Sequence, residues 1–263
     1  MRGIRWLAVA AGIAVAGCGG GGSPEVAATP ANTPGYEGAS QQQIDSMYRI
    51  SERQVRLGHW DDAIKQLDRL LLEFSPGDSR IPQARLWLGE AKFATGAHLE
   101  AAREFRRVSD ETPNDRLAPD ALLRVGDVYS DLWRRPELDP SYGQTALSTY
   151  QELLNRYPNS SAAARAQARI ADLHERFAYK EYRAALYYFK LKAYDSAILY
   201  LKDVVATYPR AAIAPDALLK LVEAYSRLGY QEDVQETCGY LRRFHPDAVR
   251  DGRHCPTETA GTS

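Results

Sequence analysis

The sequence APDALL stands at residues 118–123 and returns unchanged at residues 214–219. In each copy, a proline and an aspartate open a run of apolar residues. Proline is favoured in the first turn of an α-helix because its missing N–H would have no partner there, and an acidic residue complements the helix dipole. The apolar positions continue at helical spacing to Leu132 and to Leu228. The stretch therefore predicts two equivalent helix starts in a chain built from repeats.

A second apolar pattern occurs five times and marks the partner of such a helix. Its members lie at offsets 0, 1, 4, 7 and 8, which places them on one face of an α-helix. The copies begin at Ala63, Ala101, Ala146, Ala197 and Val234, and the second and the last are less regular. A proline lies 12 or 13 residues after each start, where it ends the helix because it lacks the N–H donor.

The two helices together form a repeated helix–turn–helix unit. Gly58, Gly96 and Gly229 lie between the first and second helices, as C-cap glycines do. The second helices begin 38, 45, 51 and 37 residues apart, and the short spacings approach the roughly 34-residue tetratricopeptide (TPR) period. The long spacings predict a loop over 133–142 and lengthened helices over 162–192. The predicted fold is all-α, an α-solenoid of about five TPR-like units, without strands.

The N-terminal segment has the features of a bacterial lipoprotein signal. Two arginines precede an apolar run at residues 6–16, which is shorter than the roughly 20 residues that span a bilayer. Cys18 follows small residues directly and resembles the lipidated cysteine of a lipobox. We expect a signal peptide over 1–17, a flexible tether over 18–40 from Cys18 carrying lipid such as palmitate, the TPR solenoid over 41–247, and a disordered tail over 248–263.

Composition and motifs argue against nucleic-acid binding and catalysis. Lys and Arg number 33 against 34 Asp and Glu, so no basic field exists to hold nucleic acid. The sequence has no phosphate loop, metalloprotease helix or nucleophile elbow. The spacing of Cys238, His245, His254 and Cys255 matches no compact zinc pattern. The sequence therefore predicts no enzyme, no cofactor and no metal site, and it leaves open whether Cys238 and Cys255 pair or stay free.

A solenoid offers a long concave face lined by the first helix of each pair. Counting from the glycines places eight residues there: Tyr48, Glu52, Arg56, Leu86, Glu90, Phe93, Leu123 and Asp127. Aromatic, aliphatic and charged side chains together suit an extended or amphipathic peptide. The alternative is a solvated surface with some packing residues, and the sequence does not decide between the two.

The stretch from residue 139 to residue 209 resembles a known family. It carries Asp139-Pro140, then Ala146, Tyr150, Leu153, Tyr157-Pro158-Asn159-Ser160, Glu181-Tyr182, Tyr187-Tyr188, Tyr194, Ala197 and Tyr208-Pro209. Together with the lipobox, the tether, the five units and the enlarged middle, this spacing resembles the BamD family, the TPR lipoproteins of the β-barrel assembly machinery. The resemblance covers nearly the whole chain after Cys18.

The resemblance implies a lipid-anchored protein on the outer membrane that faces the periplasm. In BamD-type proteins the C-terminal units dock the periplasmic domains of the barrel insertase BamA. The N-terminal units receive the C-terminal targeting segment of unfolded outer-membrane proteins, and other assembly lipoproteins are possible partners. For this chain, the resemblance places the insertase surface around Tyr200, Lys202 and Asp203, and the client site in the groove named above. Tyr200 stands where known members carry a basic residue.

A second hypothesis comes from the second unit. Its sequence Trp87-Leu88-Gly89-Glu90 looks like periplasmic TPR proteins of the Tol–Pal and cell-division type. The chain would then be an adaptor that coordinates envelope constriction with peptidoglycan synthesis, similar to CpoB. The lipobox and the long middle favour the BamD-like hypothesis.

Overall fold

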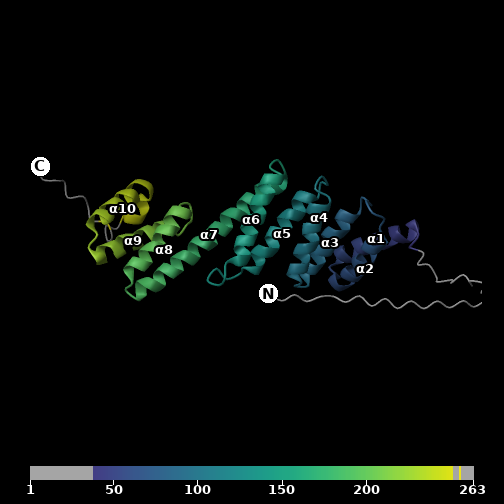
Figure 1. The fold of residues 1–263 in the computed structure, drawn as a ribbon, viewed down its shortest axis with the longest axis horizontal. Coiled ribbons are helices and arrows are strands. Elements are labelled where there is room, and N and C mark those ends of the chain that lie inside the picture. Colours follow the sequence, from purple (N-terminus) through teal and green to yellow (C-terminus); the bar gives the residue numbers. More distant parts are fainter. Residues whose placement is uncertain (1–37, 251–254, 256–263) are drawn as a thin grey trace, which may run out of the picture. The chain divides into compact units, whose positions relative to one another are not determined.

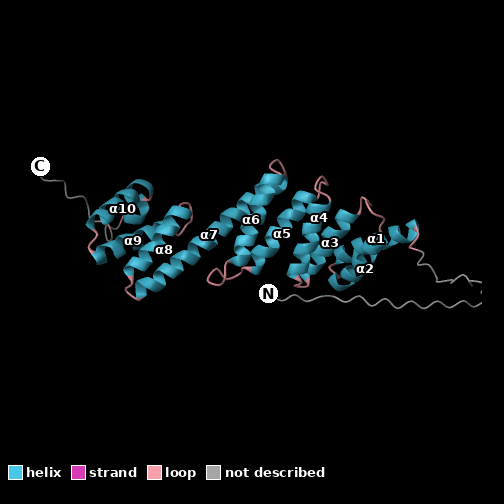
Figure 2. Ribbon diagram, in the orientation of Figure 1, coloured by secondary structure: helices cyan, strands magenta, loops and turns pink. Residues whose placement is uncertain are grey.

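The computed structural model describes residues 38–250 and Cys255, and this part of the chain contains helices and no strands (Figure 2). The helices follow one another in chain order (Figure 1). They are α1 (Gln41–Leu57), α2 (Trp60–Glu73), α3 (Ile81–Ala94), α4 (His98–Glu111), α5 (Ala118–Leu132), α6 (Ser141–Arg156), α7 (Ser161–Lys190), α8 (Tyr194–Thr207), α9 (Ala214–Leu228), α10 (Gln231–Phe244) and the short 3₁₀ helix η1 (Pro246–Val249). The helices form five pairs, which confirms the all-α TPR-like prediction.

The second helix of each pair ends just before the proline that the sequence marks. Helices α4, α6, α8 and α10 stop two residues before a proline, and α2 stops three residues before Pro76. A residue that precedes proline is pushed out of the helical conformation by the proline ring. Accordingly, Thr112, Tyr157, Tyr208 and His245 have φ between −125° and −137°.

Glycines end three of the first helices as predicted. Gly58, Gly96 and Gly229 have φ of 72°, 85° and 80°, which a residue without Cβ adopts at little cost. Helix α7 ends with the same turn but without a glycine. Lys192 takes φ 59° there, and its N–H donates to the carbonyl of Phe189 as that of Gly96 donates to Phe93.

Packing is sequential, and the first helices form a continuous row. Each helix packs against its neighbours in the chain, and α1, α3, α5 and α7 also pack against the first helix of the next pair. The second helices come no closer to one another than 8 Å between Cα atoms. We call the row of α1, α3, α5, α7 and α9 the first-helix face, and the row of α2, α4, α6, α8 and α10 the second-helix face.

The two predicted insertions lie in the middle of the chain. Residues 133–140 form the loop before α6, although Trp133 at its start is 2% exposed and packs on Phe177 with ring centroids 4.5 Å apart. The second insertion makes α7 a single helix of 30 residues. Its first half packs with α5 and α6, and its second half with α8 and α9. Helix α7 therefore joins two hydrophobic cores.

The C-terminal end settles the question of the cysteines. Cys238 of α10 and Cys255 form a disulfide, and Cys255 is 4% exposed in a core with Val234 and Leu241. The 3₁₀ helix η1 packs against α9 and α10. Folded structure thus continues past residue 247, where the sequence analysis places the start of a disordered tail.

The predicted signal peptide, Cys18 and nearly all of the tether lie outside the described residues. Within the described part, no helix combines the length and the apolar character that crossing a membrane requires.

Candidate functional site

The predicted groove residues lie on three first helices but do not share one site. Tyr48, Glu52 and Arg56 lie on α1, where Tyr48 packs on Trp87 with ring centroids 5.0 Å apart. Burial raises the pKa of Tyr48, and Glu52 adds to the shift. Leu86, Glu90 and Phe93 lie on α3, and Leu123 and Asp127 on α5.

Leu123 is not a groove residue. It is 3% exposed and packs in one core with Ala162, Ala163 and Ala166 from the first turns of α7. The long α7 covers this position, which would face the groove in a regular repeat. Leu86 packs against the core of Phe105 and Val125 and is half-buried. Glu90, Phe93 and Asp127 thus remain as the predicted residues near an open pocket.

A ladder of ion pairs crosses the first-helix face at this pocket. Glu90 of α3 accepts two hydrogen bonds of 2.6 Å from Nε and Nη2 of Arg124 on α5. Arg124 reaches Asp127 at 3.4 Å, and Asp127 accepts a hydrogen bond of 3.0 Å from Nε of Arg169 on α7. The bidentate geometry of the Glu90–Arg124 pair is the strong form of this interaction. The ladder therefore fixes three successive first helices relative to one another.

A buried tyrosine donates a hydrogen bond to Asp127. Tyr150 of α6 is fully buried, and its hydroxyl donates to Asp127 Oδ1 at 2.8 Å. The Tyr150 ring packs directly against Gly126. A Cβ at position 126 would come within 2.3 Å of the ring, so the close packing requires a glycine there. Burial raises the pKa of Tyr150, and the charge of Asp127 raises it further. Tyr150 therefore stays a neutral donor that orients the carboxylate.

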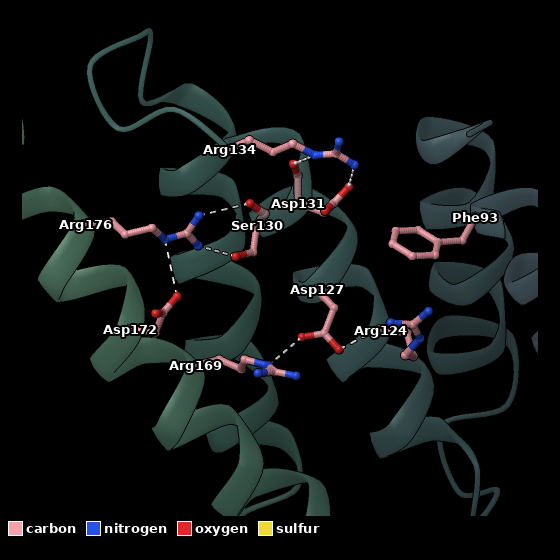
Figure 3. A pocket seen from close by; sticks show the side chains of 9 residues that line it. All are labelled: Phe93, Arg124, Asp127, Ser130, Asp131, Arg134, Arg169, Asp172 and Arg176. Atoms are coloured by element: carbon pink, nitrogen blue, oxygen red, sulfur yellow. Dashed lines mark hydrogen bonds and ion pairs between the residues drawn. The ribbon is translucent and has the colours of Figure 1, made fainter. Parts of the chain in front are cut away.

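The pocket itself lies between α3, α5 and α7 and has a volume of about 410 Å³ (Figure 3). Its lining consists of Phe93, Arg124, Asp127, Ser130, Asp131, Arg134, Arg169, Asp172 and Arg176. Four arginines face three aspartates, and Phe93 supplies an aromatic wall. The guanidinium of Arg124 lies 4.9 Å from the centre of the Phe93 ring, within the range of a cation–π contact.

The arginines differ in how much of their donor capacity is used. Arg176 donates to the carbonyls of Ser130 and Trp133, and Arg134 donates twice to Asp131. Arg169 is engaged only through Nε, so its two terminal nitrogens have no partner within the described part of the chain. Sequence reasoning missed Arg169 and Arg176 because they lie on the enlarged α7, outside the regular repeat. Their spacing of seven residues on one helix face is the signal that could have found them.

The three predicted docking residues lie on α8 and point in different directions. Tyr200 stacks on Tyr188 of α7, with ring centroids 5.3 Å apart. Lys202 lies 5.7 Å from the centre of the Tyr225 ring of α9, and a hydrogen bond with the Tyr225 hydroxyl raises the pKa of Lys202. Asp203 accepts a hydrogen bond from Thr207 within its own helix. Tyr200 and Lys202 thus contact different neighbouring helices.

Among the described residues no cluster of His, Cys, Asp or Glu has the arrangement of a metal site. Arginines dominate the pocket, and they are donors without acceptor capacity. The arrangement can therefore bind an acceptor-rich group, such as a carboxylate or a peptide carbonyl, beside an aromatic side chain.

Known proteins support the family that the sequence resembles. A family model described as an outer membrane lipoprotein, YfiO, matches residues 40–239. The outer membrane protein assembly factor BamD of Xylella fastidiosa (strain 9a5c) is 29% identical over 217 residues, which cover 78% of this chain and 73% of that protein. BamD of Vibrio cholerae serotype O1 is 33% identical over 207 residues, which cover 73% of this chain and 83% of that protein. The chain belongs to the BamD family.

Membership in this family favours the first of the two hypotheses from the sequence. It supports a role in outer membrane protein assembly, as the names of the curated relatives state it. BamD of Caulobacter vibrioides, 24% identical, matches over 94% of this chain and 79% of its own length. Among solved structures, a thermophilic TPR protein of Thermus thermophilus covers 77% of this chain and 92% of that chain, with 21% identity and a TM-score of 0.36.

Proposed function

We propose that this protein is a periplasmic scaffold of the β-barrel assembly machinery, anchored to the outer membrane through Cys18. Its first-helix face receives C-terminal segments of unfolded outer-membrane proteins, and its C-terminal units dock a BamA-like insertase. Membership in the BamD family supports the assembly role.

The observation that supports client binding is the free edge of Arg169, meaning its two terminal nitrogens Nη1 and Nη2. Its Nε is occupied by Asp127, and Asp127 is in turn held by the buried hydroxyl of Tyr150. The guanidinium is therefore held in one orientation, while Nη1 and Nη2 remain available. Two parallel N–H groups match the two oxygens of a carboxylate. The α-carboxylate at the end of a client chain is such a group.

The aromatic wall gives the pocket a second requirement. Phe93 is half-buried and lies in the lining together with Arg169. An aromatic residue at the end of a client can pack against Phe93, and aromatic pairs contribute about 0.5–1.5 kcal/mol beyond the area that they bury. A segment that ends in an aromatic residue with a free carboxylate satisfies both features.

Peptide binding tests the client site directly. The probes are two short peptides that end in phenylalanine, one with a free carboxylate and one with a C-terminal amide, followed by fluorescence polarisation. A hydrogen bond to a charged group contributes about 1.5–3 kcal/mol. The variant Arg169→Gln should therefore lower the affinity for the free-acid peptide about 10- to 100-fold. The amide peptide should bind weakly to both proteins.

Arg165→Gln is the matched control. Arg165 lies one turn earlier on α7 and pairs with Asp120 outside the pocket. Its replacement removes the same charge and should leave both affinities unchanged. Equal binding of the acid and amide peptides, or equal losses in the two variants, would contradict the proposed client site.

The docking role is tested by purifying the lipidated protein in mild detergent and identifying its partners by mass spectrometry. A barrel with periplasmic domains in stoichiometric amount is expected. Recovery of Tol–Pal or peptidoglycan-synthesis proteins without that barrel would instead favour the adaptor hypothesis.

The anchor has its own test. The thiol of Cys18 is the lipid acceptor in the proposal, so Cys18→Ser should move the protein from the membrane to the soluble periplasmic fraction. Retention in membranes after partner proteins are stripped by high salt would refute the lipid anchor.

A further inference from the structure

A groove on the second-helix face of the last two units is lined by residues that the client pocket does not use. It lies between α8 and α10, with α9 as its floor, and has a volume of about 450 Å³. Its lining consists of Lys202, Val205, Leu218, Leu221, Tyr225, Asp233, Glu236, Thr237 and Tyr240. The client pocket lies between first helices, so the two sites occupy different faces of the molecule.

The corresponding gap nearer the middle of the chain is closed by ion pairs. There, Arg106 of α4 reaches Glu152 of α6 at 2.7 Å, and Arg156 of α6 reaches Asp110 of α4 at 3.1 Å. In the C-terminal groove, Lys202 lies in the same lining as Asp233 and Glu236, and both acids raise its pKa through their charge, but neither forms an ion pair within 4.0 Å among the described residues. The gap between α8 and α10 is thus not closed by an ion pair among the described residues, and the carboxylates of Asp233 and Glu236 stay available to a partner.

The groove combines an apolar floor with an acidic rim. Leu218 and Leu221 form the floor, and the partly exposed ring of Tyr240 stands at the edge. The apolar surface continues along α10, because Phe244 is 53% exposed and its ring lies 4.6 Å from that of Tyr240. An apolar strip with unpaired carboxylates beside it fits an apolar side chain flanked by cations.

We propose that this groove docks an amphipathic helix of a partner protein, with leucine or aromatic anchors on one face and lysine or arginine beside them. A helix suits the site because residues of α8 and α10 line its two sides and residues of α9 line its floor, and a third helix can pack into the groove between two neighbouring helices. The inference rests on the proposed docking role of the C-terminal units and names the chemistry of the docked segment. It is independent of the client pocket.

Two designed peptides test the chemistry of the groove. Both are short amphipathic helices with leucines on one face, and they differ in having arginine or glutamate beside the leucines. Binding to the full-length protein in detergent is followed by fluorescence polarisation at about 0.15 M salt, where long-range attraction is screened. The leucine–arginine peptide should bind at least tenfold more tightly than the leucine–glutamate peptide.

Matched charge variants locate the site. The variant Asp233→Asn/Glu236→Gln should lower the affinity for the leucine–arginine peptide roughly five- to tenfold, which is the loss expected from two partly exposed ion pairs. The control Asp61→Asn/Asp62→Asn makes the same change of charge on the exposed start of α2 and should bind like wild type. A second variant, Thr237→Trp, fills the groove without a change of charge and should also weaken binding of the leucine–arginine peptide.

Three results would overturn the inference: no binding, equal binding of the two peptides, or equal losses in the groove and control variants. Co-purification separates this failure from failure of the proposed function. If the insertase is recovered equally with wild type and with the groove variants, docking stands and the groove is not its site. If it is recovered with neither, the docking role itself is wrong.

Discussion

Asp127 receives hydrogen bonds from three helices and gives the client pocket its geometry. Its donors are Arg124 on its own helix, Tyr150 on α6 and Arg169 on α7. A carboxylate with several donors is fixed in orientation, and it fixes its donors in return. One buried hydroxyl thereby determines where the free edge of Arg169 lies. The site depends on this chain of contacts more than on any single residue.

At Lys192 the chain adopts a backbone conformation that suits glycine better. Its φ of 59° is the only positive value among the described residues other than glycine, and a left-handed conformation costs roughly 1–2 kcal/mol for a residue with a Cβ. We predict that Lys192→Gly raises the free energy of unfolding by about 0.5–1 kcal/mol, measured by urea denaturation. Lys192→Ala is the control, because it removes the same side chain and keeps the Cβ. Equal stabilities of the two variants would show that the turn is not strained.

Only part of the site could be predicted at the level of residues. Glu90 and Phe93 were found because counting back from the helix-ending Gly96 preserves the helical register, and Asp127 because the repeat carries that register into the next first helix. The same counting included Leu123, which the first turns of α7 bury. Arg169 and Arg176 were missed because the insertion interrupts the repeat at that point. Arg169 contacts Asp127, and both arginines line the pocket, because α7 packs on α5, which no local pattern encodes.

At the scale of elements, the disulfide joins α10 to the segment that follows it. Cys238 and Cys255 are 17 residues apart in sequence and share a core with Leu241. In the chain-entropy model a crosslink that closes a loop of about 15 residues stabilises the folded state by roughly 3 kcal/mol. We predict that Cys238→Ser/Cys255→Ser increases hydrogen exchange at the amides of α10 and leaves those of α1–α4 unchanged.

Reduction provides the control for the disulfide. Dithiothreitol should raise exchange in α10 of the wild-type protein and have no effect on the double variant. If α10 exchanges equally in both proteins without reductant, the crosslink does not hold the C-terminal unit.

Elements were easier to predict from the sequence than their pairing. Helix ends follow from local chemistry, since proline removes a donor and glycine permits positive φ, so α4, α6, α8 and α10 all end where expected. The disulfide was left open because it depends on a distance across the fold, 5.5 Å between the two Cα atoms. Local signals determine where a helix stops, and packing determines which residues then meet.

At the scale of the whole molecule, α7 is the element that couples the two halves. Leu173 and Phe177 belong to the core shared with α5 and α6, whereas Ala178 and Ala185 belong to the core shared with α8, α9 and α10. In a solenoid each unit contacts only its neighbours, so cooperative unfolding depends on the interfaces between them. A single unbroken helix through both cores should make the halves unfold together.

A proline in the middle of α7 tests this coupling. Tyr179 is 37% exposed, so Tyr179→Pro disturbs little packing, but it removes one helical hydrogen bond and costs about 3 kcal/mol or more. The control Tyr179→Ala removes the same ring and keeps the helix. Trp60, Trp87 and Trp133 all precede α7, so tryptophan fluorescence reports on the N-terminal half and far-ultraviolet circular dichroism on both. We predict coincident thermal transitions for wild type and Tyr179→Ala, and for Tyr179→Pro a loss of helix that precedes the fluorescence change. Coincident transitions in the proline variant would mean that the halves are coupled by contacts outside α7.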